Sequence, residues 1–519
     1  MNIIGKMRRT LALRSRLRGI GYRIRHAAET PVERAIGWIQ EHRIPGQGIP
    51  PNHTMSIATP EVTGYTIPTL YDYGEKELAR DFARWEVSVQ RPDGAICAPG
   101  TDVPYTFDTA QLIRGLLAVL DDMPELEDNL RRACEYVARH IADDGNVLHD
   151  SYKTWEFPDG IMLSEYGNLY VLPPLLEAAR KLSEPRYEQA ARRAVEYFKR
   201  KTDLVQWKHD LGTLSHYWGY MMEALVDVGE TALAGRGLDQ AAALQGESGV
   251  IPAYPGADWV CSTGMAQLAI AWYKLGIQEP ADKAVKYLET IQNPSGGFYG
   301  GYGQHAQYFP REEIAWAVKF FLDACHWRAK CDFDREVGDY QESIDESDGR
   351  VQEILSFLGD LNGTRVIDVG CGKGRYLRVL QERFPQASLC GLDFSTRMLE
   401  SCPQGVETQC GTLLNIRYPD ASFDSVYSVE AVEHAMLAQN AIREMVRVLK
   451  PGGKIIIIDK SAHQLGRLAT KPWEQWFTPK GLVALLQTQG VQAQCKPVPY
   501  EHHTEPDGLF LAWEGVKRA

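Results

Sequence analysis

The residues best suited to chemistry lie in the segment VIDVGCGKG, residues 366–374. Its apolar residues predict a buried strand that runs into a glycine-rich turn, and an amphipathic helix follows. The glycines allow a tight turn and let a ligand approach the backbone closely, while the helix presents its positive N-terminal end. This pattern predicts a nucleotide site of the Rossmann-like kind, with Asp368 at the end of the strand.

A second acid follows at a spacing that suits a nucleoside. Asp393 lies nineteen residues after Gly374, directly after the apolar segment SLCGL, residues 388–392. A carboxylate at that point can accept hydrogen bonds from both hydroxyl groups of a ribose. Four further segments come in order: YPDASFDSV (418–426), EAVEH (430–434), REMVRVLKPGG (443–453) and the strand-like KIIII (454–458).

This ordered series resembles the class I S-adenosylmethionine-dependent methyltransferases, over residues 350–519. The resemblance implies a Rossmann-like α/β domain that uses S-adenosyl-L-methionine. Asp393 would then bind the ribose, Phe394 would lie beside the adenine, and Asp368 would orient the turn or reach the amino-acid moiety. Relatives usually place an acid at the adenine amino group, where this chain has Thr412, so Thr412 or the Leu413 backbone would take that role. The cofactor-binding residues implied in this way are Asp368, Gly370, Cys371, Gly372, Gly374, Asp393, Phe394, Thr412, Leu413 and Val429.

A base would assist transfer to a hydroxyl group, because the pKa of a hydroxyl is high. By resemblance, His434 faces the expected methyl position, and we expect it to be that base. Glu430 or Glu433 would orient His434 or bind a metal; a divalent metal is compatible with the sequence, but no motif indicates one. The alternative for His434 is a structural histidine that lines the cofactor pocket. The acceptor site is expected around Lys460, Ser461, His463 and residues 473–477.

The N-terminal part of the chain repeats with a period of about 45 to 55 residues. In each repeat an amphipathic helix and a more apolar helix are joined by a glycine-containing loop. The amphipathic helices are expected at 31–43, 77–90, 126–142, 185–201, 231–244 and 279–292, and the apolar helices at 61–74, 108–121, 163–181, 213–228, 259–275 and 311–326. Because no such hairpin buries its apolar face alone, six of them favour a closed (α/α)6 toroid, with an open solenoid as the alternative. The pattern resembles six-hairpin and terpenoid-cyclase-like toroids, and more closely the toroid proteins of bacterial exopolysaccharide biosynthesis.

The inner helices of such a ring are parallel, so their N-termini meet at one rim. Carboxylates can hydrogen-bond sugar hydroxyls there, and aromatic faces can pack on pyranose rings. Two suitably spaced carboxylates could also hydrolyse a glycosidic bond, or Tyr, His and Asn could abstract a proton beside a uronate carboxyl. The alternative is that the acids only stabilise helix starts. The expected rim residues are Glu61, Tyr65, Tyr105, Asp108, Glu165, Tyr166, Asn168, His216, Tyr217, Tyr220, Asp258, Trp259, Glu312, Glu313 and Trp316.

The charge of the chain is unevenly distributed. The net charge of −12 argues against nucleic acid as a partner, because nucleic-acid binding depends on basic residues that neutralise phosphates. Residues 1–28 nevertheless hold eight basic residues and no acid, which leaves the rest with 48 basic and 68 acidic residues. This segment is either an amphipathic helix that contacts an anionic membrane surface or a disordered tail. It lacks a secretory apolar region, so we expect a cytoplasmic protein, in the first case peripheral at the inner membrane face.

Together these patterns predict a multidomain chain, in which an all-α toroid precedes the Rossmann-like domain. The expected order is a basic segment at 1–28, the toroid at 29–329, an acidic linker at 330–349 and the methyltransferase at 350–519. The function favoured is O-methylation of a sugar in a cell-surface polysaccharide or lipid-linked glycan precursor, with the toroid binding the glycan. Three alternatives remain: a bifunctional enzyme with a lyase, epimerase or hydrolase toroid, a quinone-type small-molecule methyltransferase with a scaffold toroid, and a glycan-binding regulator that only senses the cofactor.

Overall fold

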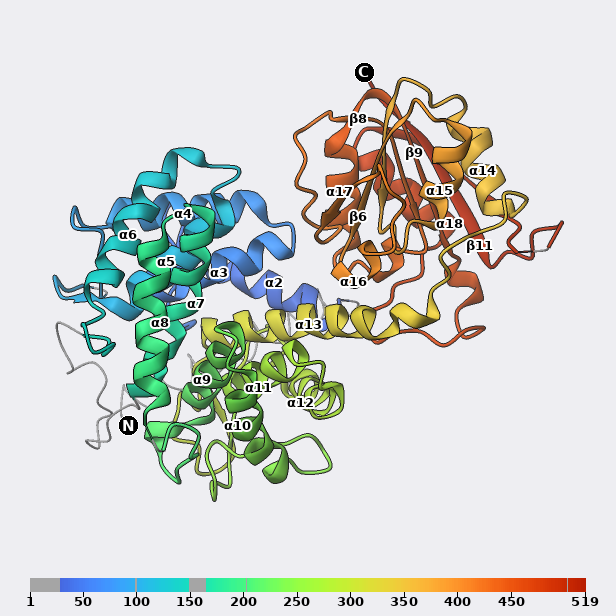
Figure 1. Cartoon of the computed structure of the whole chain (residues 1–519). Coiled ribbons are helices and arrows are strands. Elements are labelled where there is room, and N and C mark those ends of the chain that lie inside the picture. The colour runs from blue at the N-terminus through green and yellow to red at the C-terminus, as the bar shows by residue number, and fades with distance from the viewer. Residues whose placement is uncertain (1–28, 99, 149–164, 202, 502) are drawn as a thin grey trace, which may run out of the picture. The chain divides into compact units, whose positions relative to one another are not determined.

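The computed structural model describes residues 29–98, 100–148, 165–201, 203–501 and 503–519 (Figure 1). Backbone contacts divide the chain into two compact units. One comprises Met1–Tyr71 and Lys76–Cys331, and the other comprises Asp72–Glu75 and Asp332–Ala519. The first unit is rich in helices and the second contains a large sheet. The basic segment 1–28, with its expected membrane contact, lies outside the described residues.

The helix-rich unit alternates two kinds of helix, as the repeat pattern predicts. Helix α4 buries only five of its fourteen residues, whereas α11 buries twelve of its thirteen. The first kind comprises α2 (Pro31–His42), α4 (Lys76–Val89), α6 (Glu127–Arg139), α8 (Pro185–Lys199), α10 (Thr231–Leu244) and α12 (Gln278–Ile291). The second kind comprises α3 (Pro60–Asp72), α5 (Thr106–Val119), α7 (Leu172–Lys181), α9 (Ser215–Asp227), α11 (Ser262–Lys274) and α13 (Ala315–Arg335). A 3-10 helix, η3 (Glu165–Val171), replaces the first turns expected for the third apolar helix.

A glutamine at the end of an amphipathic helix recurs as a clamp between neighbouring repeats. The Gln90 side-chain amide donates to Gly94 O and to Asn129 O of the next amphipathic helix, at 3.0 Å each. Gln245 makes the same pair of bonds with Gly249 O and Pro280 O. Each clamp therefore holds a glycine loop and the start of the following helix at fixed positions.

The same device joins the last repeat to the first. Gln292, which follows α12, donates to Gly296 O and to Pro31 O at the start of α2, at 2.9 Å each. Among the apolar helices, Thr69 of α3 donates to Asp323 of α13 at 2.7 Å. The first and last helix pairs are thus in direct contact through their amphipathic helices and through their apolar helices.

Helix α13 continues to Arg335, into the segment expected to be a linker. The division between the two units falls between Cys331 and Asp332. Within the described residues, no helix is both long and apolar enough to cross a membrane.

The second unit is built on a seven-stranded sheet of order β10-β11-β9-β8-β5-β6-β7. Strand β11 runs antiparallel to both of its neighbours, and the other pairs are parallel. From β5 the sheet continues to β6 and β7 on one side and to β8 and β9 on the other. Where the strand order reverses in this way, a crevice opens at the carboxyl ends of the strands. The strands are β5 (Arg365–Val369), β6 (Ser388–Asp393), β7 (Glu407–Cys410), β8 (Phe423–Val429), β9 (Leu449–Lys460), β10 (Val491–Val498) and β11 (Phe510–Lys517).

Helices cover both faces of this sheet, which explains why its central strands are apolar on both sides. Successive strand residues point to opposite faces, so Ile367 packs with Ile442 and Leu482 while Val366 packs with Leu377. One face carries α17 (Ala438–Val448) and α18 (Pro479–Thr488), and the other carries α14 (Gly349–Leu358) and α15 (Arg375–Arg383).

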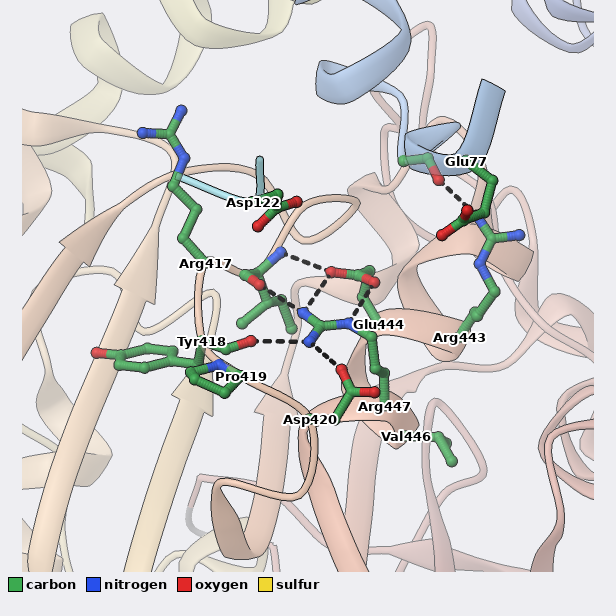
Figure 2. A network of polar contacts seen from close by, with 12 residues as sticks. Glu77, Asp122, Arg417, Tyr418, Pro419, Asp420, Arg443, Glu444, Val446 and Arg447 are labelled. Atoms are coloured by element: carbon green, nitrogen blue, oxygen red, sulfur yellow. Dashed lines mark hydrogen bonds and ion pairs between the residues drawn. The ribbon is translucent and has the colours of Figure 1, made fainter. Parts of the chain in front are cut away.

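Arg447 of α17 fixes the segment that leads into β8 (Figure 2). Its guanidinium donates to the carbonyl oxygens of Ile416 and Tyr418 at 2.6 and 2.8 Å, and to Asp420 at 2.8 Å. Glu444, one turn earlier, accepts two further bonds at 2.7 and 2.8 Å. The arginine therefore satisfies carbonyl groups that have no place in the sheet, directly after the loop that contains Thr412 and Leu413.

Gly296 and Gly229 form a matched pair that tests the contact between the last and first repeats. Both have a left-handed backbone, with φ of 90° and 91°. A Cβ on Gly296 would lie 2.0 Å from Arg34 O of α2, whereas a Cβ on Gly229 would have no atom within 4 Å. Either alanine substitution should cost about 1–2 kcal/mol of backbone strain. Gly296→Ala should cost about 1–3 kcal/mol more, because its methyl group collides with the α2 backbone.

Denaturant unfolding of the full chain, followed by circular dichroism at a helix wavelength, measures both costs. Equal destabilisation by Gly296→Ala and Gly229→Ala would contradict the close packing of this loop on α2.

Candidate functional site

The glycine turn at the end of β5 is closed by contacts with the two neighbouring strands. The backbone N–H groups of Gly370 and Cys371 donate to Leu392 O of β6, at 2.8 and 2.9 Å. A Cβ on Gly370 would lie 2.2 Å from Cβ of Ala431, just beyond β8. Since Gly370 also has a φ of 85°, only glycine allows this close approach.

Asp393 is held beside this turn by two backbone groups. One carboxylate oxygen accepts from the Gly372 N–H at 2.7 Å and the other from the Ser395 N–H at 2.9 Å. These bonds fix the carboxylate at the carboxyl end of β6, next to the glycine turn. The position fits the ribose role that the sequence predicts, and that role stays a prediction.

Asp368 is a buried acid at the end of β5. Asp368 is 1% exposed, the Tyr427 hydroxyl lies beside its carboxyl group, and its Oδ2 atom has no other hydrogen-bond partner among the residues that the structure describes. Burial, together with the charge of Asp393, raises the pKa of Asp368 to about 8. Such an acid fits a ligand that brings its own hydrogen-bond donors or positive charge, as the amino-acid moiety of S-adenosylmethionine does.

The loop after β7 lies close to the same turn. The Gly411 N–H donates to Asp393 O at 2.9 Å, and Leu413 Cδ1 lies 4.0 Å from the position of a Cβ on Gly370. The Thr412 hydroxyl accepts from the Leu414 N–H at 3.2 Å. Thr412 and Leu413 therefore flank the turn, where the sequence places the adenine contact.

The remaining predicted cofactor residues lie on the same edge of the sheet. Phe394 directly follows Asp393, and Val429 ends β8. Cys371 lies within the turn with its Sγ 4.0 Å from Sγ of Cys402.

Glu430 is engaged by two arginines. Its Oε1 atom lies 2.6 Å from Nη1 of Arg350 and 2.9 Å from Nη2 of Arg375. Its backbone is left-handed, with a φ of 55°, and its N–H donates to Ile458 O at 2.8 Å. These bonds direct the Glu430 carboxylate to the arginines, so Glu433 is the better placed of the two acids to orient His434.

Glu433 and His434 belong to a short 3-10 helix, η6 (Val432–His434), that follows β8. The Glu433 side chain is fully buried and pairs with Lys460 at the end of β9, while His434 Nε2 lies 3.7 Å from Glu433 Oε1. Burial raises the pKa of Glu433 to about 7 and lowers the pKa of His434 to about 4. His434 is therefore a neutral imidazole near pH 7, and its Nδ1 atom has no partner among the described residues.

Asp459 is a further acid here that the sequence reasoning missed. Its Oδ2 accepts from the Glu433 N–H at 3.2 Å, its Oδ1 has no partner in the part of the chain that the structure describes, and the side chain is fully buried. Burial, and then the charge of Glu433, raises its pKa well above the usual value. It follows the four isoleucines of β9, so an apolar strand that ends in an acid, as at Asp368 and Asp393, was the signal for it. Arg350 and Arg375 gave no comparable signal.

No group of three or more His, Cys, Asp or Glu side chains suited to hold a metal occurs in the described ranges. The metal role considered for Glu430 and Glu433 therefore has no ligand set to support it there.

In the helix-rich unit, part of the predicted rim gathers around His216. The His216 ring lies 4.5 Å from the Tyr220 ring and 6.4 Å from that of Trp316, and the charge of Glu61 acts on Tyr65, Tyr217 and Tyr220. The neighbouring charge of Asp108 in turn raises the pKa of Glu61. These predicted residues therefore meet: Glu61, Tyr65, Asp108, His216, Tyr217, Tyr220 and Trp316.

The structure does not place every predicted rim residue in this cluster. Glu313 accepts hydrogen bonds from Trp38 at 2.7 Å and from Asn293 at 2.9 Å, so its carboxylate fastens the last loop to α2. Glu165 pairs with Lys201 at 3.2 Å on the surface. Tyr166 donates to Asp203, and Asp258 pairs with His305 at 2.5 Å.

Known proteins match the sheet-containing unit. Residues 367–457 match the family model described as "Methyltransferase domain". The C-terminal region of this chain therefore contains a class I S-adenosylmethionine-dependent methyltransferase domain, as the sequence predicts.

Similar curated proteins include the sterol 24-C-methyltransferase of Yarrowia lipolytica, 35% identical over 22% of this chain and 32% of that protein. The 2-methyl-6-phytyl-1,4-hydroquinone methyltransferase of Synechocystis is 29% identical over 30% of this chain and 55% of its own length. The demethylmenaquinone methyltransferase of Listeria welshimeri is 34% identical over 24% of this chain and 55% of its own length. The chain thus spans about a third to about half the length of these relatives.

A solved structure of an S-adenosylmethionine-dependent methyltransferase from Mesorhizobium loti is 19% identical and has a TM-score of 0.29. The match covers 33% of this chain and 99% of that one.

The buried Asp368 predicts a specific pH dependence of stability. Because its pKa is raised in the folded state, folding favours its protonated form. The stability that this acid contributes is present below its ordinary pKa of about 4, and it is lost as pH rises to about 8. Asp368→Asn cannot ionise, so the variant should gain stability relative to the wild type as pH rises over this range.

Denaturant unfolding of both proteins at pH 5 and pH 8 measures the difference. Profiles that stay parallel between these pH values would contradict the raised pKa of Asp368.

Proposed function

We propose that this chain transfers the methyl group of S-adenosyl-L-methionine to a sugar hydroxyl, in a cell-surface polysaccharide or a lipid-linked glycan precursor. S-adenosylmethionine supplies an electrophilic methyl group on a sulfonium centre when it is bound. The residues of the chain then have to bind and align the two reactants and exclude water from them. This positioning and desolvation carry much of the catalysis of a displacement reaction.

His434 is the single observation that best supports transfer to oxygen. A buried neutral imidazole with an unpartnered Nδ1 can accept the proton of a hydroxyl group as that oxygen attacks. His434 lies three residues after Ala431, and Ala431 is in close contact with the glycine turn. In this proposal the base therefore lies at the same edge of the sheet as the predicted cofactor residues.

Glu433 acts on His434 in this proposal. A proton on Nε2 would face the Glu433 carboxylate at 3.7 Å, which leaves Nδ1 as the accepting nitrogen. Lys460 keeps the Glu433 side chain in place, and the negative charge of Glu433 stabilises the imidazolium once His434 has accepted a proton.

The helix-rich unit is, in the same proposal, a closed (α/α)6 toroid that binds the glycan. Closure is supported by the Gln292 bond to Pro31 and by the contact between Thr69 and Asp323, which join the last repeat to the first. Glycan binding is supported by the acids and aromatic rings that meet around His216.

A quinone-type small molecule is the second candidate acceptor. It is supported by the relatives named for methylation of a hydroquinone and of demethylmenaquinone. In that case the helix-rich unit would serve as a scaffold.

Methyl-labelled S-adenosylmethionine separates these acceptors. Purified full chain is incubated with the labelled compound and an extract of the producing cells that has been depleted of its own methylating activity. We expect label in polysaccharide or lipid-linked oligosaccharide. Label in a small hydrophobic molecule would favour the quinone-type acceptor, and cofactor binding without label in any fraction would contradict methyl transfer.

With the labelled acceptor in hand, His434→Gln tests the base. We expect kcat to fall by about 100-fold or more while the affinity for S-adenosylmethionine stays close to that of the wild type. His503→Gln, an exposed histidine whose ring contacts Tyr500, is the matched control. An unchanged kcat in His434→Gln would show that His434 is only a structural part of the pocket.

A further inference from the structure

The first turns of the inner helices bring two acids together in the helix-rich unit. Glu61 lies in the first turn of α3 and Asp108 in the first turn of α5. The two helices pack closely, since a Cβ on Gly64 would lie 2.7 Å from Gln111 O. Burial, and then the neighbouring acid, raises the pKa of Glu61 to about 8, and burial raises the pKa of Asp108 to about 7. Near neutral pH these groups therefore donate as well as accept hydrogen bonds.

A layer of buried tyrosines follows one helical turn further on. Tyr65, Tyr170 and Tyr220 are almost completely buried. The Tyr170 hydroxyl has no hydrogen-bond partner among the described residues, and there the Tyr65 and Tyr220 hydroxyls have none beyond each other. The Tyr170 and Tyr220 rings lie 4.3 Å apart, and both Tyr65 and Tyr220 contact the Phe320 ring, at 5.7 and 5.8 Å. The tyrosines come from α3, η3 and α9, so three different elements direct hydroxyl groups into one cluster, and Phe320 of α13 packs against two of the rings.

The neighbouring side chains also present neutral polar groups. The ring of His216 lies 4.5 Å from that of Tyr220, and its Nδ1 lies 2.7 Å from Oε1 of Gln267. Burial lowers the pKa of His216 to about 4, so its imidazole is neutral. The amide nitrogen of Gln267 has no partner within the described part of the chain.

One further turn along the helices, the charges are balanced. Lys274 pairs with Glu223 at 3.0 Å and with Asp227 at 2.8 Å. Lys319 pairs with Asp323 at 2.6 Å, and the Arg114 guanidinium lies over the Tyr170 ring at 4.4 Å. Lys274 and Lys319 are thus paired with acids, so these two cations do not favour an anionic ligand.

We infer that this cluster of Glu61, Asp108, Tyr65, Tyr170, Tyr220 and His216 is a binding site for an uncharged, polyhydroxylated ligand such as a neutral sugar ring. Hydroxyl groups of such a ligand can donate and accept, so they would satisfy the tyrosine hydroxyls and the carboxyl groups together. The aromatic rings would pack against its C–H surface. This inference rests on the proposed function only for the later use of the ligand as a methyl acceptor.

Two tyrosine variants test the inference without knowledge of the ligand. Tyr170→Phe removes a buried hydroxyl without a partner among the described residues, so the ligand-free protein should keep or raise its melting temperature. Tyr273→Phe is the matched control, because the Tyr273 hydroxyl is bonded to Asp282 at 2.6 Å, and its melting temperature should fall. A fall in Tyr170→Phe equal to that in Tyr273→Phe would show that a buried water alone satisfies this hydroxyl, which would overturn the inference.

Calorimetric titration of the full chain without S-adenosylmethionine tests the ligand class. The probes are maltotetraose, cellotetraose and chitotetraose as neutral sugars, and tetragalacturonate as the anionic comparison. We expect at least one neutral probe to bind, more tightly than tetragalacturonate, and Tyr220→Phe to weaken it by about ten-fold or more. No binding of a neutral probe, preference for tetragalacturonate, or unchanged binding in Tyr220→Phe would overturn the inference. Because methyl transfer is not measured, failure here is distinguishable from failure of the proposed reaction.

Discussion

The close approach of the Gly370 backbone to Ala431 is the constraint on which the rest of the sheet-containing unit depends. It fixes the end of β5 against the segment after β8, while Asp393 and the Leu392 carbonyl bind the same turn from β6. Three adjacent strand ends are thereby held at one edge. The turn also fixes the start of the segment that carries Glu433 and His434, because these residues lie two and three positions after Ala431. A side chain at position 370 would separate these strand ends.

Both units retain buried polar groups that cost stability. In the sheet-containing unit, Asp368 and Asp459 are almost fully buried and each keeps an oxygen without a partner among the described residues. In the helix-rich unit the buried Tyr170 hydroxyl likewise has no partner among the described residues. An unpaired buried polar group is unfavourable by about 1–3 kcal/mol, so its retention points to a ligand that completes the bonding. The two clusters differ in character, since one contains a charged Glu433–Lys460 pair and the other offers mainly hydroxyl and protonated carboxyl groups.

Much of this arrangement could be predicted from the sequence, because its signals are local. The glycine turn, the acids at the ends of β5 and β6 and the alternating helices follow from periodicity and from the residues that turns require. Partners distant in the chain gave no such signal. Glu430 looked equivalent to Glu433, but Arg350 and Arg375 engage it from segments 80 and 55 residues away. Glu313 looked like a rim acid, yet its carboxylate binds Trp38 from the other end of the unit. Burial, which determines the protonation of Glu433 and His434, is likewise a property of the folded chain.

Calorimetric titration of S-adenosylhomocysteine into the full chain tests the central claim, that the strand ends around the glycine turn form the cofactor site. Asp393→Ala should weaken binding by about 1–3 kcal/mol for the charged hydrogen bond that is lost, which is about five-fold to about 150-fold in Kd. Asp424→Ala is the matched control. Its carboxylate accepts from the Arg365 N–H and from Lys450 at the opposite ends of the strands, and its removal should leave affinity close to that of the wild type. Equal affinities of the wild type and Asp393→Ala would contradict this account of the site.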